Sequence, residues 1–491
     1  MRLRPNRSTA LSTTKVKMAP IPRFNGAPAV VVEMTEWDQV GPAQNPHLKG
    51  TSLGDDFRVQ RLADTLRGRV DVGRRPEGLE ITTTSFVGRI DVGPLRIAIR
   101  PKLPAMPLAQ LLRYAYGLRD VSIVDETRSP TTRYGLHDLL VAMLAAEVEE
   151  LLYGGLARRY VSLSEQLESP RGRILLNQVI RQGGIREARL PCHYFARQVN
   201  WQLNQVLRAG LCIAARMTED RDLRRRVHRL AEMFGEVQPK ADLDAGEIER
   251  AERGLTRLTA ANAPALTIIR LLHDMLGVGF KPLGDPSRMP GFLFDMNAFF
   301  QRLLSRFLHD NLTSARIADE QAIHNVFNYA PDANPNQRTA PAPRPDYALF
   351  RGKKLCGFLD AKYRDVWERG LPAEWLYQLS IYALASPSQV SVLLYASMAA
   401  ESCDERVEVR HPVSWSNKGP ASVIVRPVWL PRLAQLLDLE RSAQLSAERR
   451  RWAEDLVVLR TRGGRVGIGI KPRREAHISR DRNAFSEVSL R

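Results

Sequence analysis

Cysteine is scarce in this sequence, with four among 491 residues. The four are too far apart to form a C-x-x-C pair, so their spacing predicts neither a disulfide framework nor a zinc site. Long apolar runs are missing too. No stretch of about 18 apolar residues could span a membrane, and no apolar segment of a secretory signal follows the basic N-terminus. We therefore expect a cytoplasmic protein in a reducing compartment, without a membrane partner.

Motifs of several enzyme classes are also absent. The chain contains no GxxxxGKS or GxxxxGKT phosphate-binding loop, no GxSxG, no HExxH, and no GxGxxG after a strand pattern. These motifs supply a cradle for phosphates, a nucleophilic serine, a pair of zinc ligands and a dinucleotide-binding turn. Their absence argues against an NTPase of that kind, a serine hydrolase, a zinc protease and a nicotinamide-dependent dehydrogenase.

Acidic residues are fewer than basic ones, 54 against 72, which gives a formal net charge of +18. This balance favours a polyanionic partner, with nucleic acid as the first candidate and an anionic membrane as the second. A GC-rich genome explains the excess of arginine over lysine equally well. The hydrophobic fraction of 44% is ordinary, and the length predicts roughly three domains with sizeable cores.

Five ranges differ in composition and periodicity. Residues 1–26 are basic and contain no acid, which is consistent with two alternatives, a flexible arm and an artefact of the assigned start site. Residues 27–105 are predicted to form a β-rich N-terminal domain, residues 106–288 a helical region, and residues 289–435 an α/β domain with a mixed sheet. Residues 436–491 are predicted to form one amphipathic helix and a basic tail. The predicted fold class is multidomain α+β.

The individual elements follow from the period of the apolar residues. Leu95, Ile97 and Ile99 alternate with more polar residues, which predicts a half-buried strand. Helical spacing in the middle region is interrupted by one extended piece at residues 171–174. The predicted helices are 137–153, 199–216, 221–234, 297–308 and 373–384, and two further strands are 390–395 and 422–428.

The most informative part of the sequence is a pair of acidic motifs. Arg344-Pro345-Asp346-Tyr347 precedes Leu359-Asp360-Ala361-Lys362-Tyr363, and Gly352-Lys353-Lys354 supplies a turn between two apolar strands. On a strand, Asp360 and Lys362 project from the same face. A hairpin would bring Asp346 alongside them. The same alternation predicts that Cys356 and Phe358 share this face, whereas Leu355, Gly357, Leu359 and Ala361 line the opposite one.

Two carboxylates and an ammonium in this arrangement suit phosphodiester hydrolysis. A divalent metal neutralises charge on the phosphoryl oxygens and lowers the pKa of an attacking water. Mg²⁺ takes hard oxygen ligands and often has only one or two protein carboxylates. Asp346 and Asp360 are the predicted ligands, and the backbone carbonyl of Ala361 is expected to point into the same space. Lys362 would orient the water or stabilise charge in the transition state.

So short a pattern also arises by chance, and this alternative stays open at the level of the motif. Its surroundings favour a site. Asp360 and Lys362 end an apolar run, where solvation alone would not call for charges. Gln378 and Tyr382 lie four residues apart on the next predicted helix and hence on one face. This face can be directed toward the strand that carries Asp360 and Lys362.

Together, Asp346, Asp360-Ala361-Lys362 and Gln378-x-x-x-Tyr382 resemble the PD-(D/E)xK nuclease superfamily, in its branch with a QxxxY motif. Over about residues 79–430 the chain resembles the McrC family, the nuclease subunits of McrBC-type 5-methylcytosine-specific restriction systems. Further blocks that carry this likeness are Val87-Gly88-Arg89-Ile90, residues 97–103, Gly155-Leu156-Ala157-Arg158-Arg159-Tyr160, Pro170-Arg171-Gly172-Arg173, Pro191-Cys192-His193-Tyr194 with Asn204, and Phe294-Asp295-Met296-Asn297.

The resemblance implies a Mg²⁺-dependent endodeoxyribonuclease with catalytic residues Asp346, Asp360, Lys362, Gln378 and Tyr382. The metal would be bound by Asp346, Asp360 and Ala361. It also implies two partners, a separate McrB-like AAA+ GTPase and DNA that is methylated or otherwise modified. The missing phosphate-binding loop agrees with a motor supplied by another chain. In this family the N-terminal part would dock on the motor and the C-terminal part would cut.

The sequence departs from the family at one position. The helix before the nuclease core usually carries a glutamate, where this chain has Phe299-Phe300-Gln301. Gln301 cannot supply a third negative ligand, so either two acids suffice or the metal binds more weakly. An alternative function is therefore a catalytically weakened DNA-binding adaptor that activates an AAA+ NTPase. A second alternative is an unrelated nucleic-acid-binding protein in which the motif is accidental.

Overall fold

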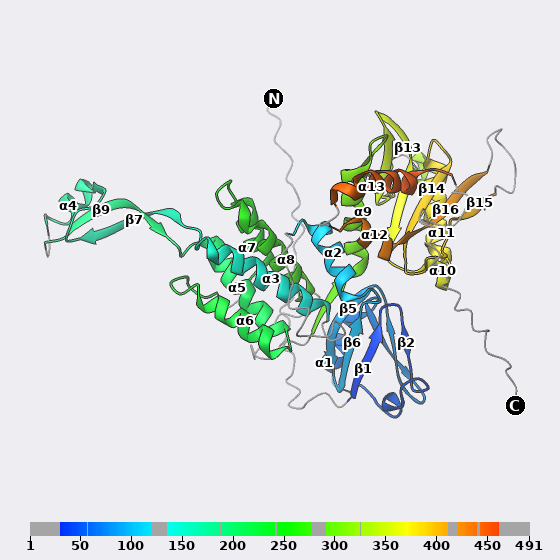
Figure 1. The fold of residues 1–491 in the computed structure, drawn as a ribbon, viewed down its shortest axis with the longest axis horizontal. Helices are drawn as coiled ribbons and strands as arrows, with labels where there is room; N and C mark the ends of the chain where they lie inside the picture. The colour runs from blue at the N-terminus through cyan, green and yellow to red at the C-terminus, as the bar shows by residue number, and fades with distance from the viewer. Residues whose placement is uncertain are drawn as a thin grey trace, which may run out of the picture. The chain divides into compact units, whose positions relative to one another are not determined.

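The computed structural model describes residues 30–118 except 56, 135–276 except 186–187 and 241–242, 291–410 except 325, 420–438 and 442–460. The chain separates into two compact units, Met1–Phe299 and Phe300–Arg491 (Figure 1). Helices and four sheets within the described ranges make it a multidomain α+β protein. The predicted arm at 1–26 and the tail beyond 460 lie outside the described residues. The predicted domain boundaries stay predictions.

The first unit begins with two sheets, as the apolar alternation predicted. One has the strand order β1-β6-β5-β10, in which β1 and β6 are parallel, and the other has the order β2-β4-β3. In β6, Leu95, Ile97 and Ile99 are buried, which confirms the predicted half-buried strand. The elements are β1 (Val30–Thr35), β2 (Gln39–Val40), α1 (Phe57–Leu66), β3 (Val70–Arg75), β4 (Gly78–Thr83), β5 (Phe86–Val92), β6 (Leu95–Arg100) and β10 (Gly291–Asp295).

Strand β10 returns to this sheet from a distant part of the sequence. It pairs antiparallel with β5, and its residues fall in the range 289–435 that the sequence pattern grouped with the C-terminal domain. Gly88 and Gly291 allow this pairing, because a Cβ on either would lie 2.2 Å or 2.6 Å from a carbonyl oxygen of the opposite strand. Helix α9 (Met296–Asn311) follows β10 directly, and the boundary between the two units falls within this helix.

Helices follow in the first unit, and the predicted helices at 137–153, 199–216 and 221–234 are confirmed. The N-caps explain where some of them begin: the side chain of Asp220 accepts hydrogen bonds from two N–H groups of α6, and Asp244 and Glu247 form a capping box at α7. The helices are α2 (Ala105–Tyr116), α3 (Leu136–Tyr153), α5 (Gln202–Met217), α6 (Arg221–Glu232), α7 (Ala245–Arg253) and α8 (Ala263–Leu276). None of the described helices has the length and apolar character needed to cross a bilayer.

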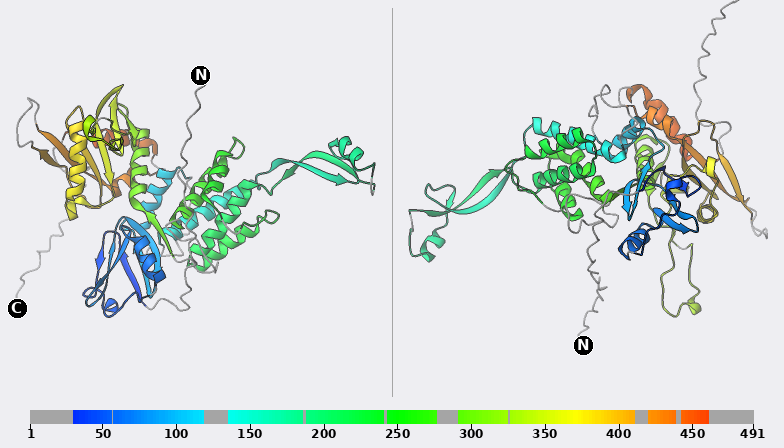
Figure 2. Two further views of the ribbon diagram at one scale, coloured as in Figure 1. Left: turned by 180° about the vertical axis from the view of Figure 1, so that it is seen from behind. Right: turned by 90° about the horizontal axis from the view of Figure 1, so that it is seen from below.

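A β ribbon interrupts these helices, and the helical pattern did not predict it. Strands β7 (Arg159–Leu167) and β9 (Leu190–Gln198) pair antiparallel, and β8 (Arg173–Ile174) and α4 (Leu176–Arg181) lie at their far end. The ribbon extends beyond the helices that precede and follow it in the chain (Figure 1 and Figure 2). No residue of β7 is buried. A strand that packs on no core leaves no apolar alternation to detect.

The second unit is built on a six-stranded mixed sheet with the order β11-β12-β13-β14-β16-β15. Neighbours β13, β14 and β16 are parallel and the other pairs are antiparallel, which confirms the predicted mixed sheet. Two helices follow Trp429. The elements are β11 (Arg316–Asp319), β12 (Tyr347–Arg351), β13 (Lys354–Lys362), α10 (Val366–Arg369), α11 (Ala373–Ala385), β14 (Val390–Ser397), β15 (Glu405–Val409), β16 (Ala421–Trp429), α12 (Leu430–Leu436) and α13 (Ser442–Val457).

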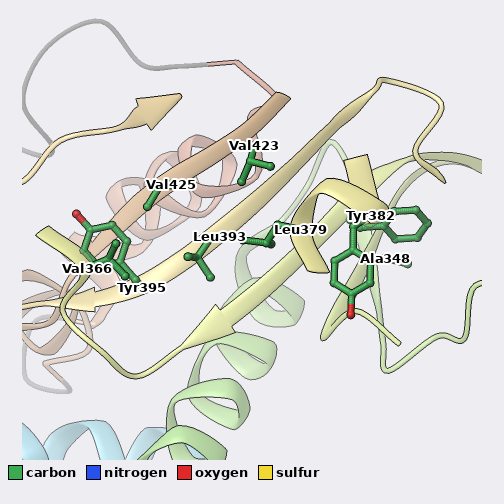
Figure 3. Packing of buried hydrophobic residues seen from close by; sticks show 9 residues of the cluster. Ala348, Val366, Leu379, Tyr382, Leu393, Tyr395, Val423 and Val425 are labelled. Atoms are coloured by element: carbon green, nitrogen blue, oxygen red, sulfur yellow. The ribbon is translucent and has the colours of Figure 1, made fainter. Parts of the chain in front are cut away.

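Helix α11 packs on one face of this sheet. Leu379 and Tyr382 point from the helix into a buried cluster of strand residues that includes Ala348, Phe358 and Leu393 (Figure 3). Each large side chain of this kind contributes roughly 1.5–3 kcal/mol when it is fully buried. The predicted helix at 373–384 therefore has a fixed position over the strand that carries Asp360.

A bulge changes the predicted facing of β13. Leu349 pairs with Gly357 but Phe350 pairs with Leu355, so Cys356 is an extra residue in the strand. Leu355 packs against the cluster that contains Phe358, and the prediction that these two side chains lie on opposite faces is therefore wrong. The cause is physical: one extra residue shifts the alternation by one position on its N-terminal side.

Candidate active site

The hairpin of β12 and β13 brings the two predicted acids together. Tyr347 pairs with Leu359, so Asp346 and Asp360, the next residue on each strand, lie side by side where the hairpin opens. Gly352, with φ +58°, forms the turn that the sequence predicted. Asp360 and Lys362 end β13, beyond the bulge, where the alternation is regular and puts both on one face.

Asp346 is held by donors from two other elements. The Ala361 N–H donates to Asp346 Oδ2 at 2.7 Å. Gln301 of α9 donates through Nε2 to both carboxylate oxygens, at 3.0 Å each. The sequence singled out Gln301 as a missing acid, and in the structure its amide fixes the orientation of the neighbouring carboxylate.

Asp360 and Lys362 form a close ion pair, with 2.8 Å between Lys362 Nζ and Asp360 Oδ2. The carboxyl side chain is 3% exposed and the lysine side chain 18% exposed. Lys362 Nζ also lies 6.0 Å from the ring centroid of Trp375, and the guanidinium carbon of Arg364 lies 5.6 Å from the same centroid. The motif did not point to Trp375. The available signal was its position, three residues before Gln378 on the helix that faces the strand.

Burial and charge together perturb the titration of all three groups. Burial, and then the neighbouring Asp360, raise the pKa of Asp346 to about 6, although Lys362, the Ala361 N–H and Gln301 act in the opposite direction. Burial also raises the pKa of Asp360. Burial alone would lower the pKa of Lys362, but Asp360 and Asp346 outweigh it, and the net shift is upward. The site therefore has a strong demand for positive charge.

The donor set fits a hard divalent cation. Among the described residues no group of three or more His, Cys, Asp or Glu side chains gathers to hold a metal, so the protein ligands would be two carboxylates with backbone oxygen. In a strand the N–H and C=O of one residue point toward the same neighbour. Since the Ala361 N–H points at Asp346, its carbonyl points to the same side. Mg²⁺ accepts such a partial set and keeps waters at its other positions.

Gln378 and Tyr382 bond to each other on α11. Gln378 Nε2 donates to Tyr382 Oη at 2.7 Å. The Tyr382 side chain is fully buried and its ring centroid lies 6.3 Å from that of Phe358. Burial, with smaller contributions from Asp360 and Asp346, raises the pKa of Tyr382 to about 12, although the hydrogen bond with Gln378 acts in the opposite direction. No hydrogen bond within the described ranges joins this pair directly to Asp346, Asp360 or Lys362.

The chain is similar to known proteins in a family profile and in its fold. The profile of the McrBC 5-methylcytosine restriction system component family matches residues 81–396. No curated protein sequence matches the chain significantly. A chain from a refined half-complex of the tetradecameric assembly of Thermococcus gammatolerans McrB AAA+ hexamers with bound McrC is 18% identical, with a TM-score of 0.56 over 87% of this chain and 100% of that chain. A second, from the cryo-EM structure of the Thermococcus gammatolerans McrBC complex, is 19% identical, with a TM-score of 0.42 over 58% of this chain and 88% of that chain.

Proposed function

Since the chain belongs to the McrBC 5-methylcytosine restriction system component family, whose profile matches more than half of it, we propose that it is the Mg²⁺-dependent DNA endonuclease subunit of a modification-dependent restriction system. In this proposal residues 300–435 form a PD-(D/E)xK nuclease core. The observation that carries the proposal is the convergence of Asp346, Asp360 and Lys362 at the open end of one hairpin, with two carboxylates whose pKa values are raised.

Asp346, Asp360 and the Ala361 carbonyl would hold the metal. When bound, Mg²⁺ supplies charge to the phosphodiester oxygens and lowers the pKa of a coordinated water. Gln301 and the Ala361 N–H keep the Asp346 carboxylate in one orientation, so that little reorganisation is needed on binding. Lys362, fixed by Asp360 and by the ring of Trp375, offers its ammonium to the phosphate being attacked.

Gln378 and Tyr382 have a supporting role in this proposal. Tyr382 packs against Phe358 of the strand that carries Asp360, and the Tyr382 hydroxyl group accepts a hydrogen bond from Gln378. With a pKa of about 12, Tyr382 keeps its proton at neutral pH and can only donate or accept a hydrogen bond. We assign both residues to positioning rather than to proton transfer.

A second chain would supply the motor. The sequence contains no GxxxxGKS or GxxxxGKT loop with which to hydrolyse a nucleotide. The structure with a TM-score of 0.56 to this chain comes from an assembly of McrB AAA+ hexamers with bound McrC. We infer that this chain binds a McrB-like AAA+ GTPase, stimulates it, and cleaves DNA that carries modified cytosine.

Cleavage of a methylated duplex by the chain together with its AAA+ partner, GTP and Mg²⁺ tests the proposal. Asp360→Ala and Lys362→Ala are each expected to abolish cleavage. Their circular dichroism spectra are expected to match that of wild type, and their thermal unfolding transitions are expected to stay cooperative. Asp310→Ala, on an exposed acid of α9, is the control, because it removes the same charge without touching the site. Full cleavage by either site variant would sink the proposal.

The adaptor function has one specific observation in its favour, the amide of Gln301 where the family usually has an acid. If the chain only activates a motor, wild type and Asp346→Ala will leave DNA intact under Mg²⁺ but will stimulate the partner's GTPase equally. Cutting by wild type that Asp346→Ala abolishes, with stimulation retained, would separate the two functions in favour of the nuclease.

A further inference from the structure

The second unit contains a cavity of about 680 Å³ at the other end of the β12–β13 hairpin. It is lined from four segments: Leu349 and Arg351 of β12; Lys354, Leu355 and Cys356 of β13; Pro387 and Ser388 after α11; and Val458, Leu459 and Arg460 after α13. The lining residues nearest the site acids are Cys356, four residues before Asp360, and Leu349, three residues after Asp346, which corresponds to about 10–13 Å along the strands. The cavity is therefore separate from the candidate active site.

Buried interactions hold the walls of this cavity in place. Arg426 donates to the backbone carbonyls of Val458 and Arg460, both at 2.8 Å, which fixes the segment after α13. Gly357 lets that segment approach β13, because a Cβ there would lie 3.0 Å from Leu459 Cδ1. Ser386 Oγ donates to the Cys356 carbonyl at 3.2 Å and ties the loop after α11 to the bulge. The cavity is thus shaped by the fold rather than by surface side chains alone.

The lining is basic and contains no acid. Its charged residues are Arg351, Lys354 and Arg460. Arg351 and Lys354 face each other across the hairpin turn, and within the described ranges none of the three forms an ion pair. All three are exposed residues of the lining, so their charged groups are accessible to an anionic ligand. Leu349, Leu355, Pro387 and Leu459 add an apolar surface beside the cations.

We propose that this cavity binds a phosphate-bearing nucleotide. Arg351, Lys354 and Arg460 would contact the phosphate oxygens, and the leucines would contact the base or sugar. The volume and the mixture of apolar wall and few charged groups are typical of small-ligand sites. The nucleotide is either free or one unit of a DNA strand. Only the second source rests on the proposed nuclease function, since the strand would then continue toward Asp360.

Isothermal titration of the metal-free full chain with deoxyadenosine 5′-monophosphate, and with deoxyadenosine as the uncharged control, tests the free source. The variant Arg351→Gln/Lys354→Gln/Arg460→Gln is expected to weaken binding of the monophosphate at least about tenfold. The matched control Lys353→Gln/Arg406→Gln/Arg450→Gln removes the same charge from exposed positions outside the cavity and is expected to bind as wild type does.

Binding of a 20-base-pair duplex in EDTA at several salt concentrations tests the strand source. Loss of phosphate contacts in the cavity variant is expected to reduce the slope of log K against log salt by about one to three, whereas the control triple changes it less. A loss confined to the monophosphate assigns the cavity to a free nucleotide, and a loss of duplex slope assigns it to a DNA strand. Each result supports the site.

The site is ruled out if the cavity variant and the control triple bind both probes alike, or if wild type binds deoxyadenosine as tightly as the monophosphate. Should the triple variant fail to fold, Ser388→Glu adds a carboxylate to the lining from an exposed position. It is expected to weaken the monophosphate about tenfold relative to Ser388→Gln. Asp360→Ala separates this site from the proposed nuclease, because it should lose cleavage and keep nucleotide binding.

Discussion

The six-stranded sheet of the second unit contains two buried pairs of opposite charge, Asp404 with Arg426 and Asp360 with Lys362. Arg426 Nη2 lies 2.7 Å from Asp404 Oδ2, and both side chains are fully buried. Lys362 Nζ lies 2.8 Å from Asp360 Oδ2, and the lysine side chain keeps 18% of its surface exposed. The ion pairs are equally close, but their surroundings differ.

Arg426 uses all of its guanidinium nitrogens. Nε and Nη2 donate to Asp404, and Nη1 and Nη2 donate to four backbone carbonyls at the end of α13 and just beyond it. The charge of such a buried cation is balanced by one carboxylate, and its N–H groups already have acceptors, so it does not attract a ligand. This pair fastens α13 to β16.

The pair at Asp360 is not balanced in this way. Asp346 lies beside it, so two carboxylates share one ammonium, and the pKa values of both acids are raised. The excess of negative charge costs the fold stability and remains available to a cation. The comparison teaches that a buried ion pair alone says little about function, whereas an incompletely compensated one in the same sheet indicates a binding site.

Neutralising the unbalanced pair should produce the largest effect. Asp360→Asn/Lys362→Met removes both charges while keeping similar volumes, and it is expected to lower DNA cleavage by about a thousandfold or more, because charge stabilisation at the phosphate is lost. The unfolding free energy is expected to change by less than about 1 kcal/mol, since neutral replacement of a buried pair is often tolerated. Cleavage assays and urea unfolding in EDTA measure the two quantities. A large loss of stability would contradict the proposed difference between this pair and the Asp404–Arg426 pair.

The same exchange at the balanced pair should act on the fold. Asp404→Asn/Arg426→Met is expected to lower the unfolding free energy by about 3–5 kcal/mol, because the ion pair is lost and four buried backbone carbonyls also lose their hydrogen-bond donor. Urea unfolding at pH 7 measures the loss. Arg406→Met, an exposed arginine on the neighbouring strand, is the control for removing one cation. An unchanged unfolding midpoint would show that the two pairs do not differ as described.

Much of this contrast could be read from the sequence, and part of it could not. Asp346, Asp360 and Lys362 are close in the chain, and a hairpin turn between apolar strands brings them together by local geometry alone. Asp404 precedes β15 and Arg426 lies in β16. The carbonyls that accept from Arg426 belong to α13 and the residues after it, so no local sequence pattern predicts these contacts. The roles of the site residues stay predictions.

Local irregularity and missing burial explain the other differences. Strand alternation assumes one residue per position, and the extra residue Cys356 moves Leu355 to the face of Phe358. The ribbon of β7 and β9 has hardly any core to pack on, so its sequence lacks the apolar period from which strands are predicted. The sequence shows only that Gln301 lacks the charge of the glutamate usual in the family. Its bond to Asp346 depends on the long-range packing of α9.

A smaller effect is expected from Asp346→Asn. The pKa of Asp346 is about 6 in the folded protein against an ordinary value of 3.8. The folded state therefore holds the proton more tightly, and the stabilisation from this group is complete below about pH 4 and is lost as the pH rises through 6. At pH 7.5 the variant should be more stable than wild type by about 1–3 kcal/mol, and at pH 4 the two should converge. Urea unfolding in EDTA at both values measures this. A difference that is the same at both pH values would contradict it.

The smallest change makes the unbalanced pair still more negative. Gln301→Glu replaces the amide that donates to Asp346 by a third carboxylate. In EDTA this should lower the unfolding free energy by about 1 kcal/mol, because like charges then face each other in a partly buried site. With Mg²⁺ present, calorimetry should show affinity raised by up to about tenfold, since charge count tunes the affinity of oxygen sites. Gln301→Met loses the amide without adding charge and should show neither the charge repulsion in EDTA nor the raised Mg²⁺ affinity. Equal Mg²⁺ affinity in the two variants would mean that Gln301 does not face the metal, and the site would then rest on Asp346, Asp360 and backbone oxygen alone.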